Sequence, residues 1–377
     1  MKVKYQVCKR CVLDTTAPKI IFNKKGYCNY CESFLEKISN SNKSDNRHNL
    51  NTLVRDIKKD GRNKKYDCIL GLSGGLDSTW ALKVIAENNL RPLAVHMDNG
   101  WNSELGQNNI YNIVDKLNVD LYTQVINWDE YKDMMNAFFE ADVLDIEILM
   151  DQAFIGSLYK QANKFNIKYI LTGQNNSNEG MGMPDGWNWY KLDKKNIKKI
   201  WFKFGKLRKI KTYPFFGTMD WLINKYLKKI QRVRFLDYVK FNDKEAIDVL
   251  VKHFDYKPYE YKHGESVFTK FYQGYILPKK FNIDKRKLHL SNKILTGQIT
   301  RDEALKILQT SPYSSQDDLN CDIEYVSKKL EWNDNYLSEY IKRPGVSHDY
   351  YGTETDMLKK LLKIKKAINN FGADAKI

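Results

Sequence analysis

Residues 70–78, with the sequence Leu-Gly-Leu-Ser-Gly-Gly-Leu-Asp-Ser, join an apolar, strand-like run to a run with helical periodicity. A tight turn at a helix N-terminus presents backbone N–H groups and partial positive charge, so it can hold a phosphate. Its glycines let the backbone approach an anion, and its serines can donate hydrogen bonds. Asp77 would repel a phosphate unless a cation lies between them, and Mg²⁺ binds carboxylate and phosphate oxygens together. We therefore expect phosphate and Mg²⁺ contacts from Ser73, Gly74, Gly75, Leu76, Asp77 and Ser78.

The string Ser-Gly-Gly-x-Asp-Ser matches the PP-loop of the ATP pyrophosphatases, whereas its glycine spacing fits neither of the two common nucleotide-binding loops. This resemblance implies that ATP is split into AMP and pyrophosphate while an oxygen of a second substrate is activated. It gives Asp77 and Ser73 catalytic roles in that reaction. The alternative is an ordinary glycine-rich turn, which the coincidence of serine, glycine and aspartate between a strand and a helix disfavours.

Four of the six cysteines form two Cys-x-x-Cys pairs near the start of the chain: Cys8, Cys11, Cys28 and Cys31. This spacing is typical of a tetrahedral zinc site, in which each pair places two thiolates on one side of the ion. Four thiolates complete the coordination of Zn²⁺, so we predict a structural role. A redox pair and an iron–sulfur cluster are the alternatives. Cys68 lies in the apolar run before the loop and is expected to be a small core residue.

The chain has 377 residues, 42% of them hydrophobic, which allows a large core and two domains or one domain with additions. It has no apolar run of about 18 residues and no signal-like start, so we expect a cytoplasmic protein without a membrane span. The net charge of +16 suggests an anionic partner. A basic segment with interleaved aromatics at 191–211 is followed by a second basic run at 225–234. Such a region could bind RNA, a nucleotide-linked sugar or an acidic protein, or form a solvated surface. Nucleic acid is the less favoured partner.

Short apolar runs alternate with longer helical stretches between residues 66 and 172. The expected strands are 66–72, 92–97, 121–126 and 168–172, and the expected helices are 78–88, 107–117 and 131–165. Such alternation predicts an α/β fold, a parallel sheet with helices on both faces. Ligands bind beyond the carboxyl ends of the strands in such sheets. Three of these ends carry polar groups: the 73–78 loop, residues 98–100, and the segment 172–179.

By the resemblance to PP-loop enzymes, the second and third of these strand ends hold the adenosine and a metal-binding acid. Adenosine contacts are expected from Met97, Asp98, Asn99, Gly173 and Gln174. Glu179 is the candidate for a second Mg²⁺-associated carboxylate, and a solvated loop acid is the equal alternative. Many PP-loop enzymes carry a histidine after the Thr-Gly pair, where this chain has Gln174.

The regions that flank this alternating segment have other patterns. Residues 33–64 are polar and predict a linker with a short helix at 53–58. Beyond residue 240 the pattern is mainly helical, with a capping box from Thr300 to Glu303 and a helical tail at 357–371. We therefore expect a zinc-binding module at 1–40, a linker at 41–64, a PP-loop domain at 65–240 and a helical, substrate-binding region at 241–377.

A third feature lies at 263–305, where the chain reads His-Gly-Glu-Ser, then Phe-Thr-Lys-Phe-Tyr-Gln-Gly-Tyr from 268 and Leu-Pro-Lys-Lys-Phe from 277. With the cysteine pairs and the PP-loop, it resembles the N-acetyl sugar amidotransferases of bacterial surface-polysaccharide biosynthesis over nearly the whole chain. The resemblance implies that the oxygen of an acetamido group on a nucleotide-linked sugar attacks the α-phosphate of ATP. Ammonia then displaces AMP, which leaves an acetamidino group on a precursor of O-antigen (lipopolysaccharide) or capsule.

The same resemblance implies ATP, Mg²⁺ and Zn²⁺ as cofactors, and ammonia from separate subunits similar to the glutaminase and cyclase of imidazole-glycerol-phosphate synthase. Neither Cys68 nor Cys321 has the sequence context of a glutaminase nucleophile. Substrate contacts are expected from His263, Glu265, Lys270, Arg286 and Arg301, and Lys270 is also assigned a catalytic role. The alternative is a helical cap in which these polar residues stabilise the domain.

Two other classes of protein fit parts of this pattern. A PP-loop enzyme that modifies tRNA would adenylate a base carbonyl, although thiolating members need further cysteines near the loop. A zinc-ribbon protein that binds RNA without catalysis would not require Asp77 and both loop serines. Steeply salt-dependent tRNA binding would favour either alternative, and capture of a glutaminase would favour the sugar amidotransferase.

Overall fold

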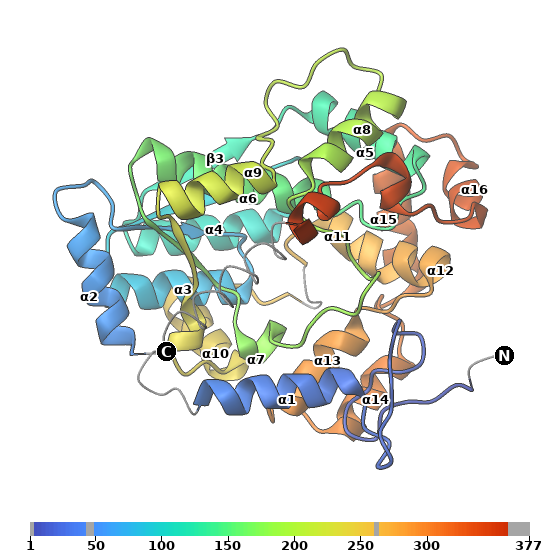
Figure 1. Cartoon of the computed structure of the whole chain (residues 1–377), viewed down its shortest axis with the longest axis horizontal. Coiled ribbons are helices and arrows are strands. Elements are labelled where there is room, and N and C mark those ends of the chain that lie inside the picture. Colours follow the sequence, from blue (N-terminus) through green and yellow to red (C-terminus); the bar gives the residue numbers. More distant parts are fainter. Residues whose placement is uncertain (1–3, 43–48, 260–263, 361–377) are drawn as a thin grey trace, which may run out of the picture.

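The computed structural model describes residues 4–42, 49–259 and 264–360 (Figure 1). Its centre is a five-stranded sheet in the order β3-β2-β1-β4-β5, and every neighbouring pair is parallel. The strands are β1 (Cys68–Gly71), β2 (Pro92–Asp98), β3 (Leu121–Val125), β4 (Tyr169–Thr172) and β5 (Gln231–Arg234). The predicted α/β fold is confirmed. The sequence does not predict β5, because a Gln-Arg-Val-Arg run lacks the apolar pattern of a buried strand.

Helices cover both faces of the sheet. Those nearest to it are α3 (Leu76–Glu87), α4 (Glu104–Lys116), α6 (Ile148–Lys164) and α10 (Asp243–Phe254). Helix α6 packs on one face, against β1, β2 and β4, and α3 packs on the other face with α4 and α10 beside it. Side chains alternate along β1, so that Ile69 joins the core under α6 while Cys68 and Leu70 join the core under α3. Burial on both faces explains why these strands are continuous apolar runs.

The strand order creates a crevice at the carboxyl end of β1. From β1 the chain proceeds to β2 and β3 on one side of the sheet, and it then crosses to β4 and β5 on the other side. The connection that follows β1 therefore runs toward one edge of the sheet, and the connection that follows β4 runs toward the other edge. Doubly wound folds bind ligands in the crevice where the direction of the connections changes in this way. The glycine- and serine-rich loop that follows β1 lies at this place.

The single helical region predicted at 131–165 is two helices, α5 (Trp128–Glu140) and α6. The break at 141–147 includes Asp142, whose φ of +53° is in the left-handed region that ends a helix. It also includes the buried carboxylates Asp145 and Glu147, whose ionic partners lie on other segments. The break thus places acidic side chains at the end of the sheet that carries the loop.

The N-terminal module contains two isolated antiparallel bridges, Val7 with Asp14 and Phe22 with Cys28, rather than extended strands. Helix α1 (Asn29–Asn42) begins within the second cysteine pair, and α2 (Leu50–Gly61) follows it along the chain. Much of the polar segment predicted as a linker is therefore helical. Only one face of α2 is apolar, and that face packs into the core beneath α3.

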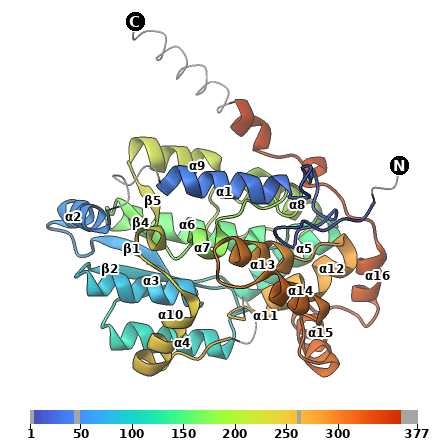
Figure 2. The same ribbon diagram turned by 90° about the horizontal axis from the view of Figure 1, so that it is seen from below.

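The C-terminal part is mainly helical, as predicted, and one apolar core joins it to α5, α6 and the cysteine module. Its helices are α11 (Val267–Phe271), α12 (Leu277–Phe281), α13 (Arg286–Leu295), α14 (Arg301–Gln309), α15 (Gln316–Leu330) and α16 (Tyr336–Lys342). Helices α13 and α14 lie beside the N-terminal module (Figures 1 and 2). The capping box at Thr300 and Glu303 is confirmed. The predicted tail helix extends into residues 361–377, which lie outside the described ranges.

No helix in the described part of the chain combines the length and the apolar composition that a membrane span needs.

Candidate functional site

The loop between β1 and α3 is held in shape by its own hydroxyl groups. The Ser78 hydroxyl accepts a hydrogen bond from the Ser73 backbone N–H at 3.2 Å and donates to the Gly75 carbonyl at 3.1 Å. The Ser73 hydroxyl accepts from the Gly75 N–H at 3.3 Å. Thr79 donates its hydroxyl to the same Gly75 carbonyl at 2.9 Å. These bonds fix a compact turn at the N-terminus of α3, which is the geometry of a phosphate-binding loop.

Two glycines allow other segments to approach this loop closely. Gly74 has a φ of +83°, and a Cβ there would lie 2.6 Å from the carbonyl oxygen of Gly106 in α4. Gly173 follows β4, and a Cβ there would lie 2.7 Å from the carbonyl carbon of Asp77 and the nitrogen of Ser78. Neither position accepts a larger residue without movement of the backbone. The turn after β4 is thereby placed directly against the first turn of α3.

A cavity of about 1600 Å³ lies at the carboxyl ends of the strands. The sequence-predicted residues that line it are Ser73, Gly75, Leu76, Asp77, Ser78, Met97, Asn99, Gly173, Gln174, Glu179 and Glu265. Gly74 and Asp98 belong to the same turns but are not among the lining residues. Asp98 instead shapes the turn after β2, because its carboxylate accepts from the Gly100 N–H at 2.9 Å. The structure therefore brings the three predicted strand ends together around one space.

Carboxylates lie on both sides of the loop. Asp77 accepts a hydrogen bond from the Asn178 side chain at 2.8 Å. A Cβ at Gly75 would lie 3.6 Å from the Glu265 carboxylate, so Glu265 lies against the loop from the C-terminal part. Burial and the nearby Glu265 and Asp77 charges raise the pKa of Tyr256, which lines the same cavity. Tyr256 is therefore a neutral phenol beside two acids.

The predicted metal acid Glu179 ends the short helix α7 (Asn176–Glu179). Nearby, Gln174 accepts a hydrogen bond from Arg232 of β5 at 2.9 Å. Within the ranges the structure describes, the four cysteines are the one group of three or more His, Cys, Asp or Glu side chains whose ligand atoms lie within 4.8 Å of one another. Mg²⁺ commonly takes one or two carboxylates and completes its shell with substrate phosphates and water, so Asp77 and Glu179 fit that requirement without a preformed cage.

The cavity lining also includes four charged side chains that no sequence motif marks: Glu147, Asp151, Lys191 and Lys285. Lys285 pairs with Glu147 at 2.6 Å, and Lys191 pairs with Asp145 at 2.7 Å and with Asp151 at 2.8 Å. Although burial opposes it, the charges of Lys191 and Lys285 hold the pKa of Asp145 below its usual value. Asp145, Glu147 and Lys285 are buried, whereas Lys191 and Asp151 are partly exposed. Buried charges are costly unless they are paired, and clusters of them often mark functional sites.

Three cationic residues expected to contact substrate lie elsewhere. Lys270 pairs with Asp318 at 2.8 Å and Asp322 at 3.1 Å, and Arg286 pairs with Asp284 at 2.8 Å. Arg301 hydrogen-bonds to backbone carbonyls of the cysteine module. None of the three is among the residues that line the cavity, and each serves a contact within the protein. His263 lies outside the described residues.

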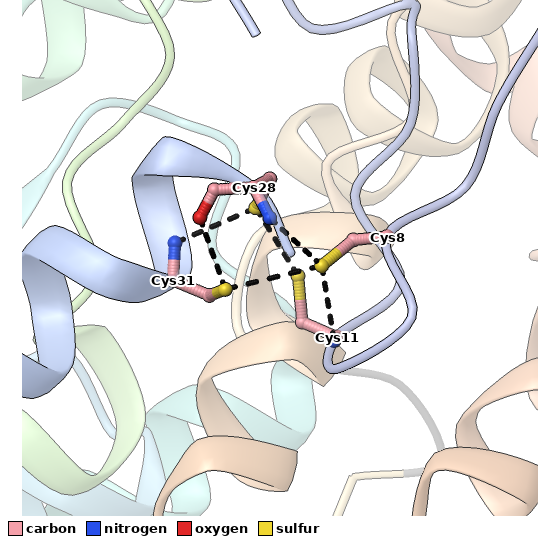
Figure 3. Close-up of side chains that lie close together, drawn as sticks. All are labelled: Cys8, Cys11, Cys28 and Cys31. Carbon is pink, nitrogen blue, oxygen red and sulfur yellow. Dashed lines mark hydrogen bonds between the residues drawn. The ribbon is translucent and has the colours of Figure 1, made fainter. Parts of the chain in front are cut away.

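The four cysteines converge in a buried cluster (Figure 3). The Cys8 and Cys31 sulfurs are 3.9 Å apart and the Cys11 and Cys28 sulfurs 3.6 Å apart. Tetrahedral coordination with Zn–S bonds of about 2.3 Å requires sulfur separations of roughly 3.8 Å, so the cluster fits Zn²⁺. Backbone N–H groups of Cys11 and Cys28 point at the Cys8 sulfur at 3.5 and 3.2 Å, which favours a thiolate there. The pKa of the Cys8 thiol is lowered, and the largest cause is its hydrogen bond with the Cys11 side chain.

Helices α13 and α14 are attached directly to this cysteine module. Arg301 donates to the Cys8 carbonyl at 2.9 Å and to the Cys11 carbonyl at 3.1 Å. The Val12 N–H donates to the Ser291 hydroxyl at 3.1 Å, and Lys287 pairs with the buried Asp14 at 2.5 Å. The module is therefore a support for the C-terminal helices and not a separate appendage.

Gly173→Ala is expected to weaken the binding of a nucleoside triphosphate at the loop by about tenfold or more. Overpacking of this kind commonly costs about 1–3 kcal/mol, and here the displaced atoms belong to the first turn of α3. Isothermal titration with Mg-ATP measures the effect. Gly182→Ala is the control, since Gly182 lines the same cavity and a Cβ there meets nothing within 4 Å. Equal affinities for the two variants would contradict the role given to Gly173.

Comparison with solved structures finds similar proteins at low identity. An NMN synthetase from Francisella tularensis is 18% identical, with a TM-score of 0.27, and the match covers 53% of this chain and 90% of that one. An NH3-dependent NAD synthetase from Campylobacter jejuni is 14% identical, with a TM-score of 0.28, and the match covers 55% and 92%.

Comparison with protein sequences and with family models finds a relative over half of the chain and a family match in its C-terminal part. An uncharacterized protein of Methanocaldococcus jannaschii is 28% identical over 195 residues, which are 51% of this chain and 65% of that protein. A family model described as the C-terminal domain of WbpG-like LPS biosynthesis proteins matches residues 265–365. Residues 265–365 are therefore similar to the C-terminal domain of WbpG-like LPS biosynthesis proteins, and this match agrees with the resemblance to a surface-polysaccharide biosynthesis family that the sequence motifs indicate.

Proposed function

We propose that this protein is an ATP-dependent amidotransferase that converts the acetamido group of a nucleotide-linked sugar into an acetamidino group in the biosynthesis of O-antigen (lipopolysaccharide) or capsule. One observation carries the proposal: the loop with Asp77 and the WbpG-like domain share one cavity. The domain contributes the lining residues Glu265, Gln273, Lys285, His289 and Lys293. A phosphate-binding loop that faces a polysaccharide-biosynthesis domain supports ATP and a sugar as joint substrates.

The size of the cavity supports two substrates. Its volume of about 1600 Å³ exceeds the roughly 300–1,000 Å³ of a pocket for one small ligand. The loop end offers backbone N–H groups and two serine hydroxyls, which suit the phosphates of ATP. Elsewhere the lining offers paired carboxylates and ammonium groups from Glu147, Asp151, Lys191 and Lys285, which can hydrogen-bond the hydroxyl groups of a sugar.

In the first step the acetamido oxygen attacks the α-phosphorus of ATP, and the bond from that phosphorus to pyrophosphate breaks. The loop N–H groups stabilise the charge that develops on the leaving pyrophosphate, and the Ser73 and Ser78 hydroxyls join them once they turn from the bonds that they make within the loop. Asp77 and Glu179 would hold Mg²⁺, which would supply the positive charge that lets a carboxylate and a triphosphate share the site. No nucleophile from the protein is needed.

In the second step ammonia adds to the activated carbon, and the carbon–oxygen bond to AMP breaks. One proton must leave the incoming nitrogen, and Glu265 is the carboxylate beside the loop that can accept it. Removal of oxygen as adenylate instead of hydroxide is what makes the exchange feasible, because AMP is the better leaving group.

The cysteines support an external source of ammonia. Burial raises the pKa of Cys68, which lies inside β1 and cannot serve as a nucleophile, and four others form the buried cysteine cluster. The remaining one, Cys321, is exposed on α15 and not among the cavity residues. We therefore assign ammonia supply to a separate glutaminase with a cyclase-like subunit, and we place the reaction in the cytoplasm.

The expected result with purified protein, Mg-ATP and ammonium is AMP formation that depends on a sugar from a pool of UDP- and CMP-linked N-acetylated sugars. Mass spectrometry should find one sugar in which NH has replaced an oxygen. A parallel reaction with bulk tRNA in place of the sugars is expected to release no AMP. Release with tRNA alone would replace this proposal by a tRNA-modifying activity.

A further inference from the structure

Asn178 links Asp77 to a second carboxylate. The Asn178 amide nitrogen donates to an oxygen of Asp77 at 2.8 Å and to an oxygen of Asp243 at 2.9 Å. Lys293 of the WbpG-like domain pairs with the other oxygen of Asp243 at 2.8 Å. Asn178 is only 6% exposed, so these bonds are shielded from water. Both amide hydrogens are thus used to fix the carboxylates of α3 and α10 relative to each other.

The helix that carries Asn178 is held in place by side chains of the C-terminal part. Helix α7 has four residues, too few to be stable alone. The buried Asn292 of α13 donates to the carbonyls of Asn176 and Ser177 and accepts from the Met181 N–H at 2.8 Å. Gln298, just after α13, donates to the Ser177 carbonyl at 2.8 Å and to the Asn178 side-chain oxygen at 3.3 Å. Asn292 and Gln298 therefore clamp α7 at both ends.

We propose that Asn178 is the positioning residue for Asp77, and that the WbpG-like domain sets the metal affinity of the ATP loop through this clamp. The inference rests on the proposed function, in which Asp77 binds the Mg²⁺ of Mg-ATP. Hydrogen bonds to a carboxylate fix its direction and keep it ionised, and both properties are needed in a metal ligand. The C-terminal domain thus acts on the nucleotide end of the cavity as well as on the sugar end.

The proposal is tested with Mn²⁺ and α,β-methylene ATP, which cannot be cleaved between the α and β phosphates. Electron paramagnetic resonance measures Mn²⁺ bound in the ternary complex, and calorimetry measures the analogue without metal. Asn178→Ala is expected to weaken Mn²⁺ binding about tenfold or more, as loss of a hydrogen bond to a charged group implies. Binding of the metal-free analogue should change by less than about twofold, because the loop donors remain.

Asn163→Ala is the matched control. The Asn163 amide also bridges two acceptors, the Tyr159 carbonyl and the Asn224 side chain, both at 2.8 Å, but it lies outside the cavity lining. Its Mn²⁺ affinity should equal that of the wild type. A purely structural role for Asn178 would lower the melting temperature and leave Mn²⁺ affinity unchanged in the folded fraction.

The outcomes separate this inference from the proposed function. Wild-type protein that fails to bind the analogue with Mn²⁺ would overturn both. Wild-type binding with an unchanged Asn178→Ala variant would overturn the positioning role alone. Should Asn178→Ala not fold, Gln298→Ala decides the matter, since it removes a donor to Asn178 and leaves α7 its Asn292 contacts. A weaker Mn²⁺ affinity in that variant supports the clamp, and an unchanged one contradicts it.

Discussion

Replacement of Asp77 by asparagine is expected to abolish the release of AMP and pyrophosphate while the protein remains folded. Asparagine has nearly the same shape and can still meet the Asn178 amide through its side-chain oxygen, so the loss is one of charge. A neutral amide is a much weaker ligand for Mg²⁺ than a carboxylate. The triphosphate would then lie at the loop without the metal ion that neutralises its charge. Loss of several kcal/mol of metal-dependent stabilisation corresponds to a decrease in rate of about 10³-fold or more.

The measurement is AMP formation by the purified variant at saturating substrates, together with its thermal unfolding. Asp129→Asn is the matched control, because Asp129 also lies in the first turn of a helix, α5, and its side chain is 72% exposed at the protein surface. The control should retain wild-type activity. Near-normal AMP formation by Asp77→Asn would remove this residue from the metal site and leave Glu179 or Glu265 as the candidates.

The loop between β1 and α3 could be predicted because its signal is local. Ser73, Asp77 and Ser78 stand in one short string between a strand and a helix, and the alternating pattern places the ends of β2 and β4 beside it. The cysteine pairs are equally local, since their spacing alone brings four sulfurs together.

The charged side chains elsewhere in the cavity could not be predicted, because their signal is distributed along the sequence. Glu147 and Lys285 are 138 positions apart, and nothing in either neighbourhood marks a site. Conversely, Arg286 and Arg301 lie in a motif-rich block and have the charge expected of phosphate ligands. In the structure Arg286 pairs with Asp284, and Arg301 donates to the carbonyls of Cys8 and Cys11. The type of a residue thus predicts that it has a negatively charged or polar partner, but it does not predict where in the fold that partner lies.

The difference between local and distributed signals also explains which helices could be predicted from the sequence. The capping box at Thr300 is a four-residue pattern and is predictable. Helix α7 also has a local cap, Asn175, but its four residues depend on tertiary contacts from Asp237, Asn292 and Gln298. Tertiary contacts of this kind override local propensity. Asn178, which sits on α7, was accordingly absent from the predicted site residues although it touches the central carboxylate.

Cys8→Ser is expected to remove bound zinc and to lower the melting temperature by more than about 5 °C. Serine is a poor zinc ligand, and three remaining thiolates with an open position hold the metal far less tightly. The consequence extends beyond the module, because the Cys8 carbonyl accepts the Arg301 guanidinium and Ser291 of α13 accepts from Val12. Zinc content by atomic absorption and calorimetric unfolding measure these effects, with the exposed Cys321→Ser as the matched control.

Because α13 both rests on the cysteine module and clamps α7, loss of zinc should also reach the ATP loop. The path runs from Ser291 to its neighbour Asn292, then through α7 to Asn178 and Asp77. Cys8→Ser protein that remains folded should therefore bind Mn²⁺ with α,β-methylene ATP more weakly than Cys321→Ser protein. Full zinc content in Cys8→Ser would contradict the four-cysteine site. Loss of zinc with unchanged Mn²⁺ affinity would confine its role to the N-terminal module and show that α13 holds α7 without that support.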